Sequence, residues 1–238
     1  MNFDIQNFGS IKIGSLELWI TQTHIATWFV MGILICFAVV VRIKMNKFKD
    51  VPKGLQNVVE LMVETFNNFL KDSAGEKFFF LGSWFFTVFA VVLLSNIIGI
   101  VPIIALRAPT ADWSFTVTLA MVTFLLIHII GVRYRGFGYV KSMFEPFLFG
   151  KIPNLILFPL NLVGELARPI SLSFRMFGNV LSGTILMGLF YGMVPVFLRF
   201  FIPSFLHAYF DLFSGVLQTY VFTVLSLSFI SAAAATEE

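Results

Sequence analysis

Charged residues are scarce in this chain, and their scarcity excludes most classes of soluble protein. Only 12% of the 238 residues are charged, against roughly 25% in an average soluble domain. Hydrophobic residues make up 58%, and the mean hydropathy is +0.90. The net charge of +3 is small, and the basic residues are spread along the chain without interleaved aromatic residues, which argues against nucleic-acid binding. The composition indicates an integral membrane protein.

Cysteine and catalytic motifs are also nearly absent. Cys36 is the single cysteine and lies in an apolar run, so no disulfide forms within the chain and a small buried residue is the expected role. The N-terminus has no basic segment followed by an early apolar core, so we expect the first apolar run to stay in the mature protein. No nucleophile motif, phosphate-binding glycine loop or metal-ligand cluster is present. We predict no cofactor and no metal site, and ion conduction rather than bond-making.

Three conventional membrane spans are readable, at residues 25–41, 78–104 and 115–132. Each is near the roughly 17 to 25 residues that cross a hydrocarbon core of about 30 Å. Basic residues concentrate in the connections that follow the first and third spans, whereas the connection after the second holds only Arg107. Since basic loops stay in the cytoplasm, we expect residues 1–24 outside the cell.

Between the first two spans, residues 55–72 form an amphipathic pattern. Apolar residues such as Val59, Met62 and Phe66 recur at helical spacing, and Glu60 and Glu64 lie elsewhere on the helix. We expect this helix to lie along the cytoplasmic interface. The alternative is a soluble-facing helix packed on a partner.

The last third of the chain is almost continuously apolar. We predict two long helices, at residues 155–193 and 204–235, joined by an external hairpin around Arg199. At 1.5 Å per residue the first exceeds the thickness of the hydrocarbon core, so it must tilt steeply, run along the interface or bend, and Pro169 offers a place to bend. The predicted fold is an all-α membrane protein with about five crossings and a cytoplasmic C-terminus. No internal repeat is visible, which disfavours an inverted-repeat transporter.

Polar residues line one face of the first long helix at steps of three or four. Arg175 stands out, because arginine stays charged in proteins and costs about 2.5–3.5 kcal/mol near the bilayer centre. Polar groups in lipid must face protein or a water-filled cavity. The stripe consists of Asn161, Glu165, Arg168, Ser171, Arg175, Asn179 and Ser182.

Several members of this stripe have a structural alternative. Ser171, Asn179 and Ser182 could be hydrogen-bonding contacts between helices. Glu165 and Arg168 lie nearer the cytoplasmic end and could extend to the interface.

A second polar face lies on the last helix, where Asp211, Ser214, Gly215 and Gln218 share one side. An intramembrane carboxylate can bind a cation or exchange a proton. Asp211 is therefore a candidate site residue, and an external interfacial position is its alternative.

Four stretches resemble subunit a of the F-type ATP synthase membrane sector, and they cover essentially the whole chain in order. They are ELARPISLSFRMFGN at 165–179, SNIIGIVP at 95–102, APTAD at 108–112 and LQTYVF at 217–222. The resemblance implies a stator subunit, not catalytic alone and without a nucleotide site, in the plasma membrane of a bacterium. It also implies two protein partners, a rotating ring of c subunits with mid-membrane carboxylates and a peripheral stalk of subunit b.

The resemblance further assigns residues to an H⁺ or Na⁺ path. Arg175 matches the essential arginine that pairs with each passing ring carboxylate and separates two offset half-channels, and Asn179 and Gln218 match polar positions near it. Asp211 and Asn96 fall at positions associated with the external half-channel. Glu165, Arg168 and Ser171 lie toward the cytoplasmic one.

One position departs from the family pattern. Thr184 stands where many members carry glutamate, and Asp211 stands where some carry histidine, so the acidic group has moved from one helix to the other. Ser182 and Thr184 complete the predicted path. A self-contained cation channel or secondary transporter remains the rival interpretation, because polar stripes alone would serve it.

Overall fold

The computed structural model describes most of the chain. The described residues are 7–13, 16–100, 107–142, 147–148, 152–153, 157–195, 205–206 and 208–235. The predicted external hairpin around Arg199 and the last residues of the predicted 78–104 span lie outside them. The side chain of Asp211 also lies outside the described part, although its backbone lies within it.

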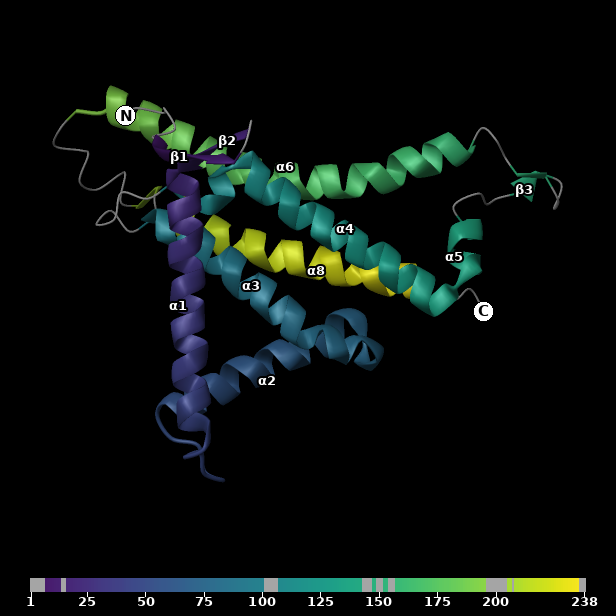
Figure 1. Ribbon diagram of the computed structural model, residues 1–238, viewed down its shortest axis with the longest axis horizontal. Coiled ribbons are helices and arrows are strands. Elements are labelled where there is room, and N and C mark those ends of the chain that lie inside the picture. The colour runs from purple at the N-terminus through teal and green to yellow at the C-terminus, as the bar shows by residue number, and fades with distance from the viewer. Residues whose placement is uncertain are drawn as a thin grey trace.

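Within the described ranges, five helical segments are long and apolar enough to cross a membrane, which confirms the predicted all-α membrane fold. They are α1 (Gln22–Met45), α3 (Gly82–Ile97) with the 3₁₀ helix η1 (Glu76–Leu81), α4 (Trp113–Arg135), α6 (Leu157–Met193) and α8 (Ser214–Ala234). Figure 1 shows α3, α4, α6 and α8 grouped together, with α1 projecting across one end of the group.

The amphipathic helix is α2 (Leu55–Ala74), and two glycines mark its ends. Gly54 (φ 59°) precedes it and Gly75 (φ 84°) follows it, in left-handed conformations that favour glycine. Phe66 and Leu70 on its apolar face are buried. The second half of this apolar face thus packs on the bundle, whereas Met62 in the first half is exposed.

Helix α8 forms the centre of the bundle. Its Leu227 and Ile230 join one apolar cluster with Phe66, Leu70 and Phe85. Its Phe222 joins a second cluster, with residues of α3, α4 and α6. Contacts with all four neighbouring helices therefore hold α8 in place, and Figure 1 shows it lying between α3 and α4.

Helix α6 is one continuous helix of 37 residues, or about 55 Å at 1.5 Å per residue. Pro169 is buried inside it, and Figure 1 shows the helix bowed along its length. A proline ring removes one backbone hydrogen bond and bends a helix. The length and the bend agree with the sequence pattern.

Several short elements were not expected from the sequence. An antiparallel hairpin of β1 (Asn7–Ile13) and β2 (Leu16–Thr21) leads directly into α1. The segment predicted as one helix over 204–235 is π-helical in η5 (Ala208–Phe213) before α8 begins. The remaining short elements are η2 (Ile98–Ile100), η3 (Pro109–Ala111), α5 (Phe137–Ser142), β3 (Phe147–Leu148) and β4 (Ile152–Pro153).

Candidate functional site

Asn96 joins three segments of the bundle near the end of α3. Its side-chain nitrogen donates to the Gly215 carbonyl at 3.0 Å and to the Thr219 hydroxyl at 3.2 Å, and its oxygen accepts a 2.6 Å bond from the Thr110 hydroxyl. Only 5% of Asn96 is exposed. Because a buried amide is costly without partners, these bonds hold α3, η3 and α8 together around a polar centre.

Gly215 allows this close approach between α3 and α8. A Cβ atom at this position would lie 3.0 Å from Cβ of Asn96, which is tighter than ordinary van der Waals contact. Small residues at helix contacts in membranes let backbones come close enough for such bonds. Gly215 is thus a structural requirement of the Asn96 network.

A second polar contact joins α6 to α8. The side-chain nitrogen of Asn179 donates to the Ser214 hydroxyl at 2.6 Å. Ser214 directly precedes Gly215, so the two polar contacts meet at the first turn of α8. The structure therefore brings Asn179 and Asn96 to the same turn of α8.

Arg175 lies one turn before Asn179 but on the exposed side of α6. No described residue forms an ion pair or hydrogen bond with its guanidinium. The ring of its neighbour Phe174 lies 4.3 Å from the ring of Trp113, the first residue of α4, at a tilt of 50°, and the Phe177 ring lies 5.7 Å from the same ring. These aromatic contacts fix this turn of α6 against α4 and leave the cation directed outward.

Small residues surround Arg175 on the same face. Ser171, Gly178 and Ser182 lie four, three and seven positions away, and the first and last are exposed. A Cβ on Gly178 would meet no atom within 4 Å. The fold itself therefore does not require glycine there, and small residues at such a position let a neighbouring helix approach.

Gln218 and Ser95 carry buried polar atoms. Their exposed fractions are 7% and 0%, and neither Gln218 Nε2 nor Ser95 Oγ has a hydrogen-bond partner among the described residues. A buried polar group left unpaired costs about 1–3 kcal/mol. The Gln218 amide nitrogen can donate a hydrogen bond, and the Ser95 hydroxyl can donate or accept one, so both atoms are available to water.

Glu165 and Arg168 form a separate group on α6. Glu165 and Arg168 make an ion pair at 3.0 Å, and the Arg168 guanidinium lies 5.2 Å from the ring of Phe229 on α8. Tyr139 on α5 is sensitive to this ion pair: burial, and then the charge of Glu165, raise the pKa of Tyr139 above its ordinary value of 10.0. This pair lies two to three turns from Arg175, near the α5 end of the bundle.

The other predicted site residues do not join the polar layer, the group of buried and half-buried polar side chains around Asn96, Asn179 and Gln218. Ser171 is exposed, and the hydroxyls of Ser182 and Thr184 donate to carbonyls of their own helix, those of Asn179 and Val180, at 3.0 and 2.9 Å. Asp211 lies in η5 one turn before Ser214, and its side chain is outside the described part. In the described ranges no group of three or more potential metal ligands comes together.

Sequence reasoning missed Thr110 and Thr219 as members of the site. Both are buried and bond to Asn96. Thr219 follows Gly215 by one helical turn, so the polar face of α8 could have been extended to it. Thr110 belongs to the irregular segment before α4, where no periodicity indicates which side chain points inward.

The family model and the similar proteins below all carry the same family name. Residues 24–231 match the family described as ATP synthase A chain. A relative from Propionigenium modestum, "ATP synthase subunit a, sodium ion specific", is 39% identical over 232 residues, covering 89% of this chain and 73% of the relative. "ATP synthase subunit a" from Acidothermus cellulolyticus is 37% identical, covering 78% and 67%. "ATP synthase subunit a 2" from Syntrophotalea carbinolica is 36% identical, covering 89% and 84%.

Proposed function

This chain belongs to the ATP synthase subunit a family, a component of the membrane sector, and we propose that it is the ion-translocating stator subunit of a rotary F-type enzyme. It lies beside a ring of c subunits and gives ions access to their carboxylates through two offset half-channels. Ion flow through it drives ring rotation, and rotation drives ATP synthesis by other subunits of the complex.

The observation that carries the proposal is the outward position of Arg175. A permanent cation on an exposed face of a membrane helix is costly in lipid unless an anion meets it. No described residue supplies one, and we infer that the partner belongs to another chain. A carboxylate on a neighbouring helix is the simplest anion that can reach a cation bordered by the small residues Ser171, Gly178 and Ser182.

The strength of such a pair suits a moving contact. At an effective dielectric constant of about 20, unit charges 4 Å apart attract by about 4 kcal/mol before desolvation. Desolvation of both groups reduces this value. The pair therefore favours one ring position and still releases its carboxylate. The same fixed charge repels cations that would otherwise pass directly between the half-channels.

Two groups of polar residues on either side of Arg175 support the half-channels. The layer containing Asn96, Asn179 and Gln218, with Asp211 nearby in the chain, serves the external side. Glu165 and Arg168, near α5, serve the cytoplasmic side, and Ser171 lies between them and Arg175. Hydroxyl and amide oxygens accept either a hydrated proton or Na⁺. The translocated ion is H⁺ or Na⁺. The relative from Propionigenium modestum is named as sodium ion specific.

The basic connections set the orientation. We propose that the β1–β2 hairpin lies outside and the C-terminus in the cytoplasm of a bacterium, since the basic residues concentrate after α1 and at the end of α4. Subunit b of the peripheral stalk then holds this chain against rotation. Membrane lipid covers the remaining surface.

The testing experiment is ATP-driven ion uptake into inverted vesicles that carry the assembled complex. Arg175→Ala is compared with Arg133→Ala, an exposed arginine at the far end of α4, at matched complex content. Arg175→Ala should abolish uptake and Arg133→Ala should retain it. Undiminished coupled uptake with Arg175→Ala would contradict the proposal. Ion conduction by the chain alone, without the ring, would favour a self-contained channel or transporter instead.

A further inference from the structure

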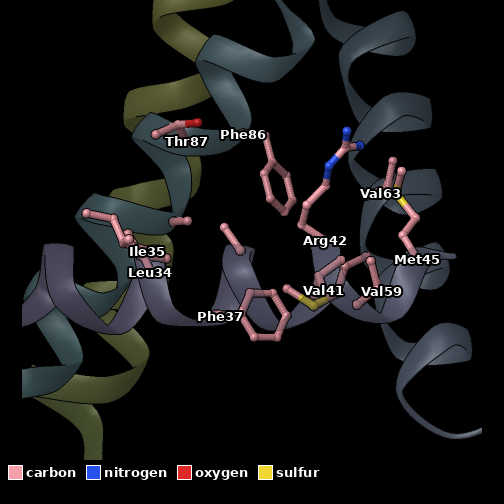
Figure 2. A pocket seen from close by; sticks show the side chains of 13 residues that line it. Leu34, Ile35, Phe37, Val41, Arg42, Met45, Val59, Val63, Phe86 and Thr87 are labelled. Carbon is pink, nitrogen blue, oxygen red and sulfur yellow. The ribbon is translucent and has the colours of Figure 1, made fainter.

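An apolar groove lies between α1, α2 and α3, away from the polar layer. Its volume is about 480 Å³, within the range of small-molecule sites. The lining residues are Leu34, Ile35, Phe37, Ala38, Val41, Arg42, Met45, Val59, Met62, Val63, Phe86, Thr87 and Ala90. Figure 2 shows that the three helices contribute to it from different sides. Apart from Arg42 and the Thr87 hydroxyl, the lining side chains are apolar.

The length of the groove along α1 is close to the thickness of the hydrocarbon part of one lipid leaflet. Along α1 its lining extends from Leu34 to Met45, which is about 16 Å at 1.5 Å per residue. Half of a hydrocarbon core of about 30 Å is about 15 Å. An acyl chain lying along α1 would therefore be covered over most of its length.

Arg42 places a cation in this groove. Figure 2 shows its guanidinium reaching away from α1, between Phe86 of α3 and Val63 of α2. No carboxylate among the described residues pairs with it. A guanidinium matches a phosphate group with two parallel hydrogen bonds. Since Arg42 and Lys44 form the basic last turn of α1, the charged end of the groove lies where lipid headgroups are expected.

A second apolar pocket adjoins the first. It lies between α2, α3 and α8, has a volume of about 470 Å³ and shares Met62, Phe86 and Ala90 with the groove. Two pockets of nearly equal size on the two sides of Phe86 match the two chains of a diacyl lipid.

We propose that the α1–α2–α3 groove is a binding site for an anionic diacyl phospholipid, with its phosphate on Arg42 and its chains in the two apolar pockets. A transmembrane helix fits less well. An apolar helix would leave the Arg42 guanidinium without an anion, whereas a lipid phosphate pairs with it. The proposal does not depend on the ion path or on Arg175.

The first experiment places a photo-crosslinking benzophenone amino acid at Val63 in the assembled complex. The complex is reconstituted with phosphatidylcholine and a minor fraction of phosphatidylglycerol. Mass spectrometry of the crosslinked chain should show phosphatidylglycerol enriched about tenfold over its share of the membrane. A crosslink to another polypeptide would identify a protein occupant and overturn the proposal, as would lipid captured in the bulk ratio.

The second experiment separates the site from general surface charge. Arg42→Gln should remove the phosphatidylglycerol enrichment, whereas Lys44→Gln, which removes an equal charge from the same turn but does not line the groove, should retain it. Equal losses from the two variants would overturn the proposal. Ala38→Trp fills the groove without a change of charge and should reduce capture of both lipids at Val63. Unchanged capture would place the lipid outside the groove.

Discussion

Asn179 on α6 donates a 2.6 Å hydrogen bond to Ser214 on α8, 35 positions later in the chain. Arg175 lies one turn before Asn179, yet Arg175 is exposed and Asn179 is half-buried. The polar face of α6 therefore divides, with one side chain anchored to α8 and the other directed outward. Rotation of α6 about its axis would break the bond and turn the cation away from its present side.

We expect the Asn179–Ser214 bond to be measurable as a coupling between the two helices. In a cycle of Asn179→Ala, Ser214→Ala and the double variant, the coupling in the free energy of unfolding should be about 0.6 kcal/mol and at most about 1.7. Unfolding in mixed detergent micelles gives the three values. Strict additivity would show that the bond contributes nothing to helix placement.

Gly215→Ala should destabilise the protein, because the added methyl group meets Asn96 at 3.0 Å and overpacking costs about 1–3 kcal/mol. Gly192→Ala on α6 is the control. Its Cβ would meet no atom within 4 Å, and alanine is the better helix former by up to about 1 kcal/mol. The midpoint of thermal unfolding should fall for Gly215→Ala and rise for Gly192→Ala. Equal shifts would mean that the α3–α8 contact tolerates a side chain.

The membrane-spanning helices were predictable from sequence, because length and apolar composition are local properties of a segment. The amphipathic pattern at 55–72 likewise identified α2. The β1–β2 hairpin was missed although Ile11-Lys12-Ile13 and Leu16-Glu17-Leu18 alternate in polarity on either side of Gly14-Ser15, which is a short-range hairpin signal. The π-helical turn before α8 leaves no periodic signal that distinguishes it from α-helix.

The site was predictable only in part. Steps of three and four residues placed Arg175 and Asn179 on one face, about 40° apart around the helix at 3.6 residues per turn. The periodicity does not show which edge of this face meets α8 and which edge points outward. The bond from Thr110 to Asn96 depends on how the loop before α4 folds into the bundle, which is a property of the tertiary structure.

Gly178→Leu should block function without loss of stability if the Arg175 face meets a ring helix. A side chain at this position enters open space in the isolated chain, so the free energy of unfolding should change by no more than about 0.5 kcal/mol. ATP-driven uptake by the assembled complex should fall about tenfold or more. Gly32→Leu, at an open position on α1, should retain uptake. Normal uptake with Gly178→Leu would exclude close contact on this face.

Asp112 should make stability depend on pH at the start of α4. Burial opposes its charge, but hydrogen bonds from Ser114 and Thr23 and the charge of Arg107 lower the pKa of Asp112 below its ordinary value of 3.8. A lowered pKa in the folded state stabilises the protein above pH 3.8, and this stabilisation is lost as the pH falls through the folded-state value. Asp112→Asn should therefore lower the thermal midpoint at neutral pH, and the difference from the unaltered chain should disappear in acid. A difference that persists unchanged would assign the effect to hydrogen bonding alone.

Asp211→Asn should slow ion transport without preventing assembly. The substitution keeps the size of the side chain but replaces the acidic group in η5 with an uncharged amide. If Asp211 loads ions from the outside, the uptake rate of the variant should be lower, and its dependence on pH should differ from that of the unaltered complex. Thr184→Ser changes size alone and is the control. Uptake rates equal to those of the unaltered complex over a broad pH range would remove Asp211 from the external path, and Asn96 and Gln218 would then be its remaining polar groups.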